Sequence, residues 1–264
     1  MTRQLLIYNE VTPVSFARHA DFSVKAIGDY GFARGINSVP LVASEIVPAS
    51  AEYPVVFAVA PDGVVPVAVL GIDEGTNLFV GDDGKWLGKY VPAFLRRYPF
   101  VFSSTDAGQR FTLCVDESYS GCNRENRGER LFDADGEQTL RLKAVLEFLQ
   151  QYQVEFERTR VFGRSLQDLG LLEPMTAKFN LPGNGERVLG GFHAIDRNRL
   201  RALGGEALDR LARTDELELA YLQMNSMRHF TDLLERAAKP AANAVSDVPA
   251  EASSGADSDE AVRH

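Results

Sequence analysis

The chain has 264 residues, of which 45% are hydrophobic and 25% are charged, and this balance excludes a fibrous or wholly disordered protein. The formal net charge of −9 argues against nucleic acid as a partner, because phosphate binding needs a clustered excess of Lys and Arg. No stretch approaches the roughly 18 apolar residues of a transmembrane segment, and residues 1–10 lack the ~7–15 residue apolar run of a secretory signal, so we expect a cytoplasmic protein.

The N-terminal half contains β-branched runs separated by turn residues. Proline presets φ and glycine accepts positive φ, so each such turn predicts a hairpin. The connections are too short for crossovers, and the strands are therefore expected to be antiparallel. The expected strand pairs are residues 54–60 with 65–71, residues 77–80 with 85–87, and residues 98–103 with 110–115.

Two short helices are predicted before the longest helix of the chain. Short helices are expected within residues 40–53 and 91–97, the second opened by Pro92. The longest predicted helix runs from Glu137 to about Arg160, because apolar residues recur there mostly at three- and four-residue steps. A separate short helix is expected at residues 165–171, with Ser165 as its N-cap.

The rest of the chain predicts one more hairpin and then helices. The hairpin pairs residues 177–181 with 186–193, and the helices cover residues 197–202, 205–212 and 217–238, the first capped by Asp196. The predicted class is therefore α+β, an antiparallel β-sheet of consecutive hairpins in the N-terminal half packed with amphipathic helices in the C-terminal half.

One globular domain is expected over residues 1–238, followed by a disordered acidic tail over residues 239–264. The tail has no aromatic residue, no Leu and no Ile, so it cannot bury enough apolar area to offset its chain entropy. A solubilising extension is favoured over an interaction or export signal.

No recognised cofactor or metal motif is present, since the chain lacks the phosphate-binding glycine loops, His-Glu-x-x-His and Cys-x-x-Cys. We therefore expect no cofactor and no metal. One pattern leaves an alternative: His19-Ala20-Asp21 has the His-x-Asp spacing of a facial iron triad, to which His193 or His229 could add a ligand. A surface histidine beside an exposed aspartate explains the same letters and is favoured.

Cys114 and Cys122 are expected to be free thiols, as is usual in a reducing compartment. Cys122 lies in a polar stretch where Arg124 and Arg127 could lower the pKa of its thiol, with His193 or His229 as a base. A cysteine without a chemical role is the favoured alternative. Cys114 lies in an apolar run and is expected in the core.

Aromatic residues and arginines gather between residues 86 and 98, a combination that is favoured at binding surfaces. Core packing explains the same residues and is the favoured interpretation for Trp86 and Tyr98. For Arg96 and Arg97, core packing and a binding surface are equally favoured. The candidate ligand-binding residues are Trp86, Tyr90, Arg96, Arg97 and Arg124.

Three segments of the sequence resemble the bacterial SapC family, which is named for a surface-layer gene cluster. They are VPLVASE at 39–45 continuing into YPVVF at 53–57, YVPAFLRRYPF at 90–100, and GFHAID at 191–196. The likeness spans roughly residues 5–235. It implies an association with surface-layer formation in some bacteria and, in others, gene neighbours that encode outer-membrane receptors and flavin-dependent halogenases; no established reaction comes with the family.

The leading functional hypothesis is a non-catalytic binding or accessory protein that recognises a small anionic ligand or a partner protein, linked to surface-layer or outer-membrane uptake loci. The alternative is an enzyme without a recognised motif, or the partner of one, that acts on an amino acid or peptide through Cys122, His193 and Asp116 brought together by folding. A structural protein of the surface layer is a further alternative.

Overall fold

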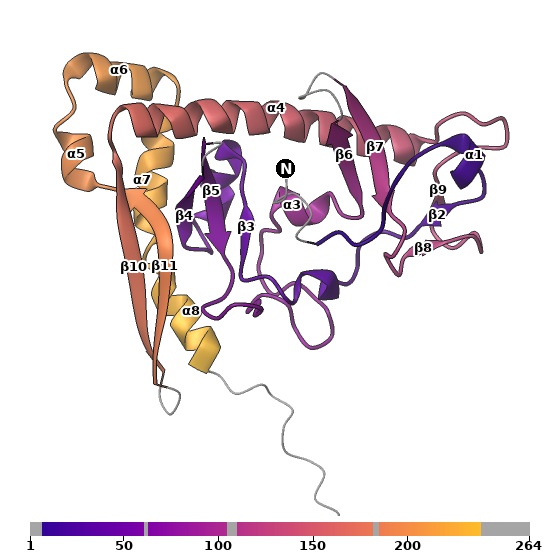
Figure 1. The fold of residues 1–264 in the computed structure, drawn as a ribbon, viewed down its shortest axis with the longest axis horizontal. Helices are drawn as coiled ribbons and strands as arrows, with labels where there is room; N and C mark the ends of the chain where they lie inside the picture. Colours follow the sequence, from indigo (N-terminus) through magenta and orange to yellow (C-terminus); the bar gives the residue numbers. More distant parts are fainter. Residues whose placement is uncertain (1–6, 61–62, 105–109, 182–184, 239–264) are drawn as a thin grey trace, which may run out of the picture.

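In the computed structural model of the chain, the described residues are 7–60, 63–104, 110–181 and 185–238. Antiparallel sheets and helices confirm the predicted α+β class (Figure 1). The tail predicted to be disordered lies outside the described residues.

The strands form three antiparallel sheets within the described residues, with the orders β10-β11-β4-β5-β3, β1-β7-β6 and β8-β2-β9. Their bounds are β1 (Val11–Pro13), β2 (Ser23–Val24), β3 (Ser38–Pro40), β4 (Val55–Ala60), β5 (Gly63–Val69), β6 (Phe100–Ser104), β7 (Phe111–Asp116), β8 (Cys122–Asn123), β9 (Glu129–Arg130), β10 (Leu172–Leu181) and β11 (Gly185–Ile195).

The hairpins β4-β5, β6-β7 and β10-β11 are those that the turn residues predict. They do not all join one sheet, because β7 pairs with β1 on its other side, while β11 pairs with β4. The predicted hairpin around residues 81–84 is reduced to an isolated bridge between Val80 and Trp86.

The helices are α1 (Phe16–His19), α2 (Ile46–Ala49), α3 (Ala93–Arg96), α4 (Leu140–Asp168), α5 (Arg197–Arg201), α6 (Gly205–Arg213), α7 (Glu216–Ser226) and α8 (His229–Ala238), with 3-10 turns η2 (Gly31–Ala33) and η3 (Ala43–Glu45). Asp196 caps α5 as predicted, because its carboxylate accepts from the N–H groups of Asn198 and Arg199.

Two helix predictions are wrong. Ser165 does not open a separate helix, because Phe162 and Leu166 continue the buried stripe and α4 extends to Asp168. The helix predicted over residues 217–238 is divided into α7 and α8 after Ser226. The hydroxyl of Ser226 donates to Gln223 O at 2.6 Å, and such a bond to the preceding turn often bends a helix.

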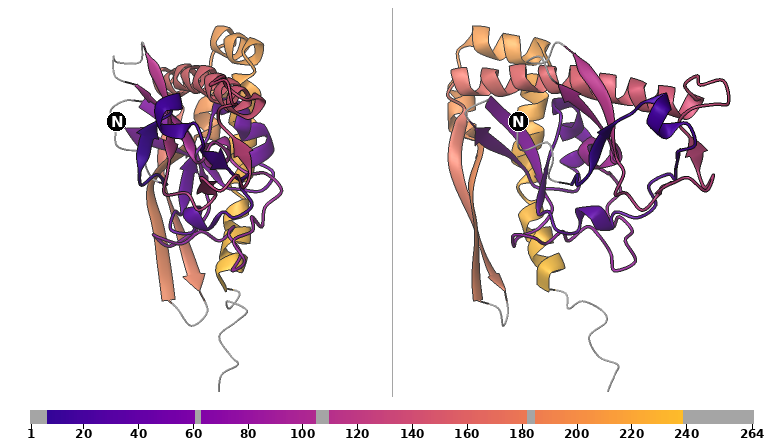
Figure 2. Two further views of the ribbon diagram at one scale, coloured as in Figure 1. Left: turned by 90° about the vertical axis from the view of Figure 1, so that its right-hand side faces the viewer. Right: turned by 45° about the vertical axis from the view of Figure 1, so that its right-hand side comes forward.

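Helix α4 runs along the molecule and joins two hydrophobic cores (Figures 1 and 2). Leu142 and Leu149 pack in a core with β6 and β7, whereas Phe162 and Leu166 pack in the larger core with the five-stranded sheet. Gly163 lets α4 approach β5 closely, since a Cβ at this position would lie 2.2 Å from Val64 O of β5. The backbone of α4 is therefore held directly against β5.

Helices α7 and α8 cover the long β10-β11 hairpin, at the end of the molecule away from β8 and β9 (Figures 1 and 2). Pro174 is tolerated in β10 because this strand is the edge of its sheet. The middle part of α4, between the two cores, faces η3 and α3, and this is where a pocket opens.

Candidate functional site

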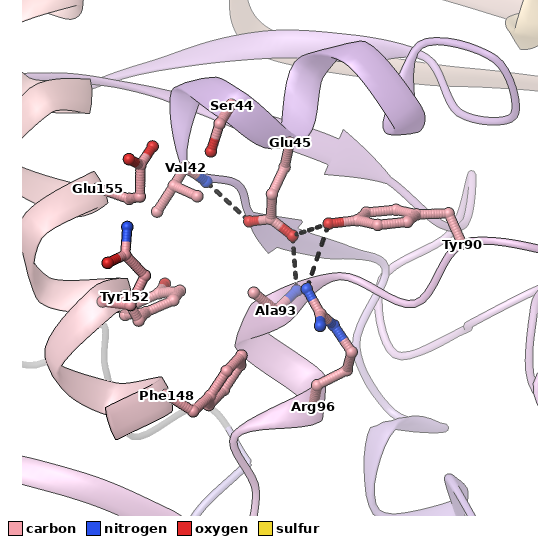
Figure 3. Close-up of a pocket in the computed structure, with 10 residues that line it drawn as sticks. Val42, Ser44, Glu45, Tyr90, Ala93, Arg96, Phe148, Tyr152 and Glu155 are labelled. Atoms are coloured by element: carbon pink, nitrogen blue, oxygen red, sulfur yellow. Dashed lines mark hydrogen bonds between the residues drawn. The ribbon is translucent and has the colours of Figure 1, made fainter. Parts of the chain in front are cut away.

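A pocket of about 300 Å³ lies between the middle of α4 and the segments that carry η3 and α3 (Figure 3). Part of its lining is apolar, because Val42, Ala93 and Tyr152 form a small cluster with Phe148 packed against it. The lining residues are Val42, Ser44, Glu45, Tyr90, Ala93, Arg96, Phe148, Gln151, Tyr152 and Glu155.

Glu45 organises one wall of the pocket although its side chain is buried, with 4% exposed. Its Oε2 accepts from Val42 N at 2.9 Å, and its Oε1 accepts from Ala93 N and from the hydroxyl of Tyr90, both at 2.6 Å (Figure 3). Charge-assisted bonds of this kind compensate a carboxylate for its lost hydration. Glu45 therefore ties η3, the loop at Tyr90 and the start of α3 together.

The phenol of Tyr90 is held in its protonated form. Burial is the main cause that raises its pKa, and the adjacent charge and hydrogen bond of Glu45 raise that pKa further, while Arg96 opposes the effect. Tyr90 therefore acts as a hydrogen-bond donor to Glu45 and not as a proton acceptor at neutral pH.

Arg96 supplies the positive charge of the pocket. Its guanidinium lies over the rings of Tyr90 and Phe148, 5.8 and 5.4 Å from their centroids, and its Nε donates to Val91 O at 3.0 Å. Nη2 is 3.5 Å from the hydroxyl oxygen of Tyr90. These contacts orient a side chain that is exposed to solvent, and among the described residues no carboxylate forms an ion pair with it.

Thr159 fastens α4 to η3. It is fully buried, and its Oγ1 accepts from Ala43 N at 2.7 Å while donating to Glu155 O at 2.6 Å. The two walls of the pocket are thus joined by a buried polar link, which favours a preformed site over a mobile one.

Glu155 lies on the α4 wall, and Figure 3 shows it across the pocket from Arg96. One carboxylate oxygen, Oε2, is buried and has no hydrogen-bond partner among the described residues. A buried acceptor without a donor costs about 1–3 kcal/mol, and more when it is charged. Oε2 is closed to solvent, and Glu155 presents the negative charge of its carboxylate at the wall of the pocket.

The structure brings two of the five predicted ligand-binding residues, Tyr90 and Arg96, into the pocket. Trp86 is half-buried behind them, where its Nε1 donates to Tyr90 O at 3.0 Å. Arg97 is buried, with its guanidinium 4.3 Å from the ring centroid of Phe94. Arg124 pairs with Asp21 and donates to Arg18 O at 2.9 Å, and it does not line the pocket.

Sequence reasoning missed Glu45 and Glu155, the acidic groups of the site. A signal for Glu155 is present in the sequence: Phe148, Gln151, Tyr152 and Glu155 share one face of α4, so polar residues interrupt an otherwise apolar stripe. The matching signal for Glu45 is weaker, a Glu three residues after Val42 in a short turn.

The iron-triad hypothesis fails on geometry. His19 is fully buried, so it is not the surface histidine of the favoured alternative either; its Nε2 lies 3.2 Å from Glu117 Oε1. Asp21 faces Arg124 instead. Within the described ranges no group of three His, Cys, Asp or Glu is placed to hold a metal ion.

The hypothesis that Arg124 and Arg127 lower the pKa of the Cys122 thiol is wrong. Burial, with Asp116 and Glu117 nearby, raises the pKa of Cys122 to about 12, so the neighbouring arginines do not activate it. Its Sγ lies 3.6 Å from Asp116 O. His193 lies on β11, in another sheet, and its Nδ1 has no partner among the described residues. Both cysteines are free, and Cys114 is buried as predicted.

The fold and the site define an α+β protein with a small, charged and aromatic-walled pocket beside a long helix. No helix in the described part of the chain combines the length and the apolar character needed to cross a bilayer. The family model described as SapC matches residues 14–233, and the chain belongs to this family. No curated protein and no solved structure matches the chain.

Proposed function

We propose that the protein is a non-catalytic binding or accessory protein, and that its pocket takes a small ligand through an anionic group placed at Arg96. The observation that carries this proposal is the guanidinium of Arg96, an exposed residue of the pocket lining that two aromatic rings and a carbonyl orient. An arginine presented in this way suits a carboxylate or phosphate, which it can bind with two parallel hydrogen bonds.

The size of the pocket favours a small ligand over a partner protein. Its volume of about 300 Å³ is at the small end of the roughly 300–1,000 Å³ that ligand pockets span. Membership of the SapC family adds, as part of the same proposal, an accessory role for gene loci of the surface layer or of outer-membrane uptake.

The chemistry of the lining supports binding more than catalysis. The oxygens of Glu45 are occupied by donors of the protein, and the raised pKa of Tyr90 keeps its proton in place at neutral pH. Groups held in this way maintain the shape of a site and exchange no proton with a ligand.

A thermal-shift screen tests the proposal. The full chain is heated with acetate, succinate, inorganic phosphate or the free L-amino acids, and at least one of them should raise the melting temperature. That stabilisation should be lost in Arg96→Gln and retained in Arg124→Gln, the matched arginine outside the pocket. Stabilisation by none of these compounds, or equal stabilisation of Arg96→Gln, would contradict the proposal.

A further inference from the structure

We infer that the ligand of this pocket is zwitterionic, a free α-amino acid whose carboxylate binds Arg96 and whose ammonium group binds Glu155. The inference rests on the proposed function, because it takes Arg96 as the site of the anionic group. It adds the second charge and so names the class of the ligand.

The pocket carries charges of both signs on separate walls. Arg96 belongs to α3, and Glu155 belongs to α4. Glu45 needs no ligand, because Val42 N, Ala93 N and the hydroxyl of Tyr90 already satisfy its oxygens. The charged groups left to face a ligand are one guanidinium and one carboxylate.

A ligand with a single charge would pair with only one of the two charged residues, Arg96 or Glu155. A pure anion at Arg96 would leave the negative charge of Glu155 without a partner in the same pocket. An ammonium group supplies a positive charge and up to three donors to the Glu155 carboxylate, while the carboxylate of the same molecule occupies Arg96.

The remaining lining accommodates the side chain of an amino acid. Phe148, Tyr152 and Val42 give the pocket apolar surface between its two charged groups. The volume of about 300 Å³ suits a molecule of this size. Because Thr159 fixes α4 to η3, the spacing of the two charged walls is set before the ligand arrives.

Matched ligands separate the two charges. The L-amino acid that gives the largest thermal shift is compared by calorimetry with its des-amino acid and with its decarboxylated amine, on the full chain. The amino acid should bind at least about tenfold more tightly than either analogue, since each lacks one charge-assisted contact.

Variants of α4 then assign the ammonium site. Glu155→Gln should weaken the amino acid by about tenfold and change the des-amino acid by less than about threefold. Glu157→Gln, a change of the same kind on the exposed side of α4, should leave both affinities unchanged.

Each result has a consequence for the inference. A des-amino acid that binds as tightly as its amino acid, or an amino acid whose affinity is unaffected by Glu155→Gln, overturns the zwitterion and leaves the anion proposal standing. If no amino acid binds while acetate, succinate or phosphate does through Arg96, the inference fails and the proposed function survives. If no compound binds, both fail.

Discussion

The hydroxyl of Tyr90 donates to Glu45 Oε1 at 2.6 Å, and by this bond a loop residue covers a carboxylate that is almost entirely removed from water. The same oxygen accepts from Ala93 N at the start of α3, so α3 is positioned by a residue 48 positions earlier in the chain. Because Arg96 belongs to α3, the placement of the positive charge of the pocket depends on the buried negative one.

Removal of the Glu45 carboxylate should destabilise the protein strongly. Glu45→Ala leaves Val42 N, Ala93 N and the hydroxyl of Tyr90 without their acceptor, and we expect a loss of about 3 kcal/mol in the free energy of unfolding. Tyr90→Phe removes one donor and should cost about 1 kcal/mol. Urea unfolding followed by circular dichroism measures both. Equal losses in the two variants would show that Glu45 does not organise this wall.

The buried hydroxyl of Thr159 should contribute more to the free energy of unfolding than its methyl group does. Thr159→Val keeps the shape but leaves Ala43 N without an acceptor, and we expect a loss of about 2 kcal/mol in the free energy of unfolding. Thr159→Ser keeps the hydroxyl and should lose less than half as much. The same urea titration compares them, and a serine variant as unstable as the valine variant would disprove the polar link.

Local sequence patterns predict the helices and hairpins of this fold better than they predict which strands pair in which sheet. Turn residues around Gly63 and the apolar stripe of α4 are local, and the hairpin and helix that they predict are present. Which sheet a hairpin joins depends on contacts between distant residues, such as His193 with Phe57. For that reason the sequence pattern predicts one sheet where the strands of the described residues divide among three.

Nearness along the chain also separates the site residues that are predictable from the sequence from those that are not. Tyr90 and Arg96 lie close together in a short segment of unusual composition, so proximity in sequence exposed them. Glu45 and Glu155 are single acidic residues that are ordinarily solvated on a helix or turn, and only tertiary packing places them at the pocket. Trp86 and Arg97 share that composition but face away from the pocket into the interior, a distinction that composition does not make.

Close contact between α4 and β5 should make Gly163 intolerant of any side chain. Gly163→Ala would place a Cβ 2.2 Å from Val64 O, so the helix must shift, and overpacking of this kind costs about 1–3 kcal/mol. The gain in helix propensity, about 1 kcal/mol, is smaller than the upper part of this range. Thermal unfolding should therefore occur at a lower temperature in Gly163→Ala, whereas Val161→Ala on the exposed side of α4 should change little. An unchanged melting temperature in Gly163→Ala would contradict the close approach.

Cys122 should make the protein sensitive to alkali. Burial raises the pKa of its thiol from 9.0 to about 12, so the folded state keeps a proton that the unfolded state loses above pH 9. The contribution of this group to stability is therefore complete below about pH 9 and declines as the pH rises toward the folded pKa, by about 1 kcal/mol at pH 10. Cys122→Ala removes this contribution to the pH dependence, and the difference between the two proteins isolates it from Cys114 and the buried tyrosines, whose pKa values are also raised. Urea unfolding at pH 8 and pH 10 measures that difference. A wild-type protein that loses no more stability than Cys122→Ala between these pH values would show that the thiol is not protected. Slow alkylation of Cys122 by iodoacetamide at pH 8 should accompany the expected result.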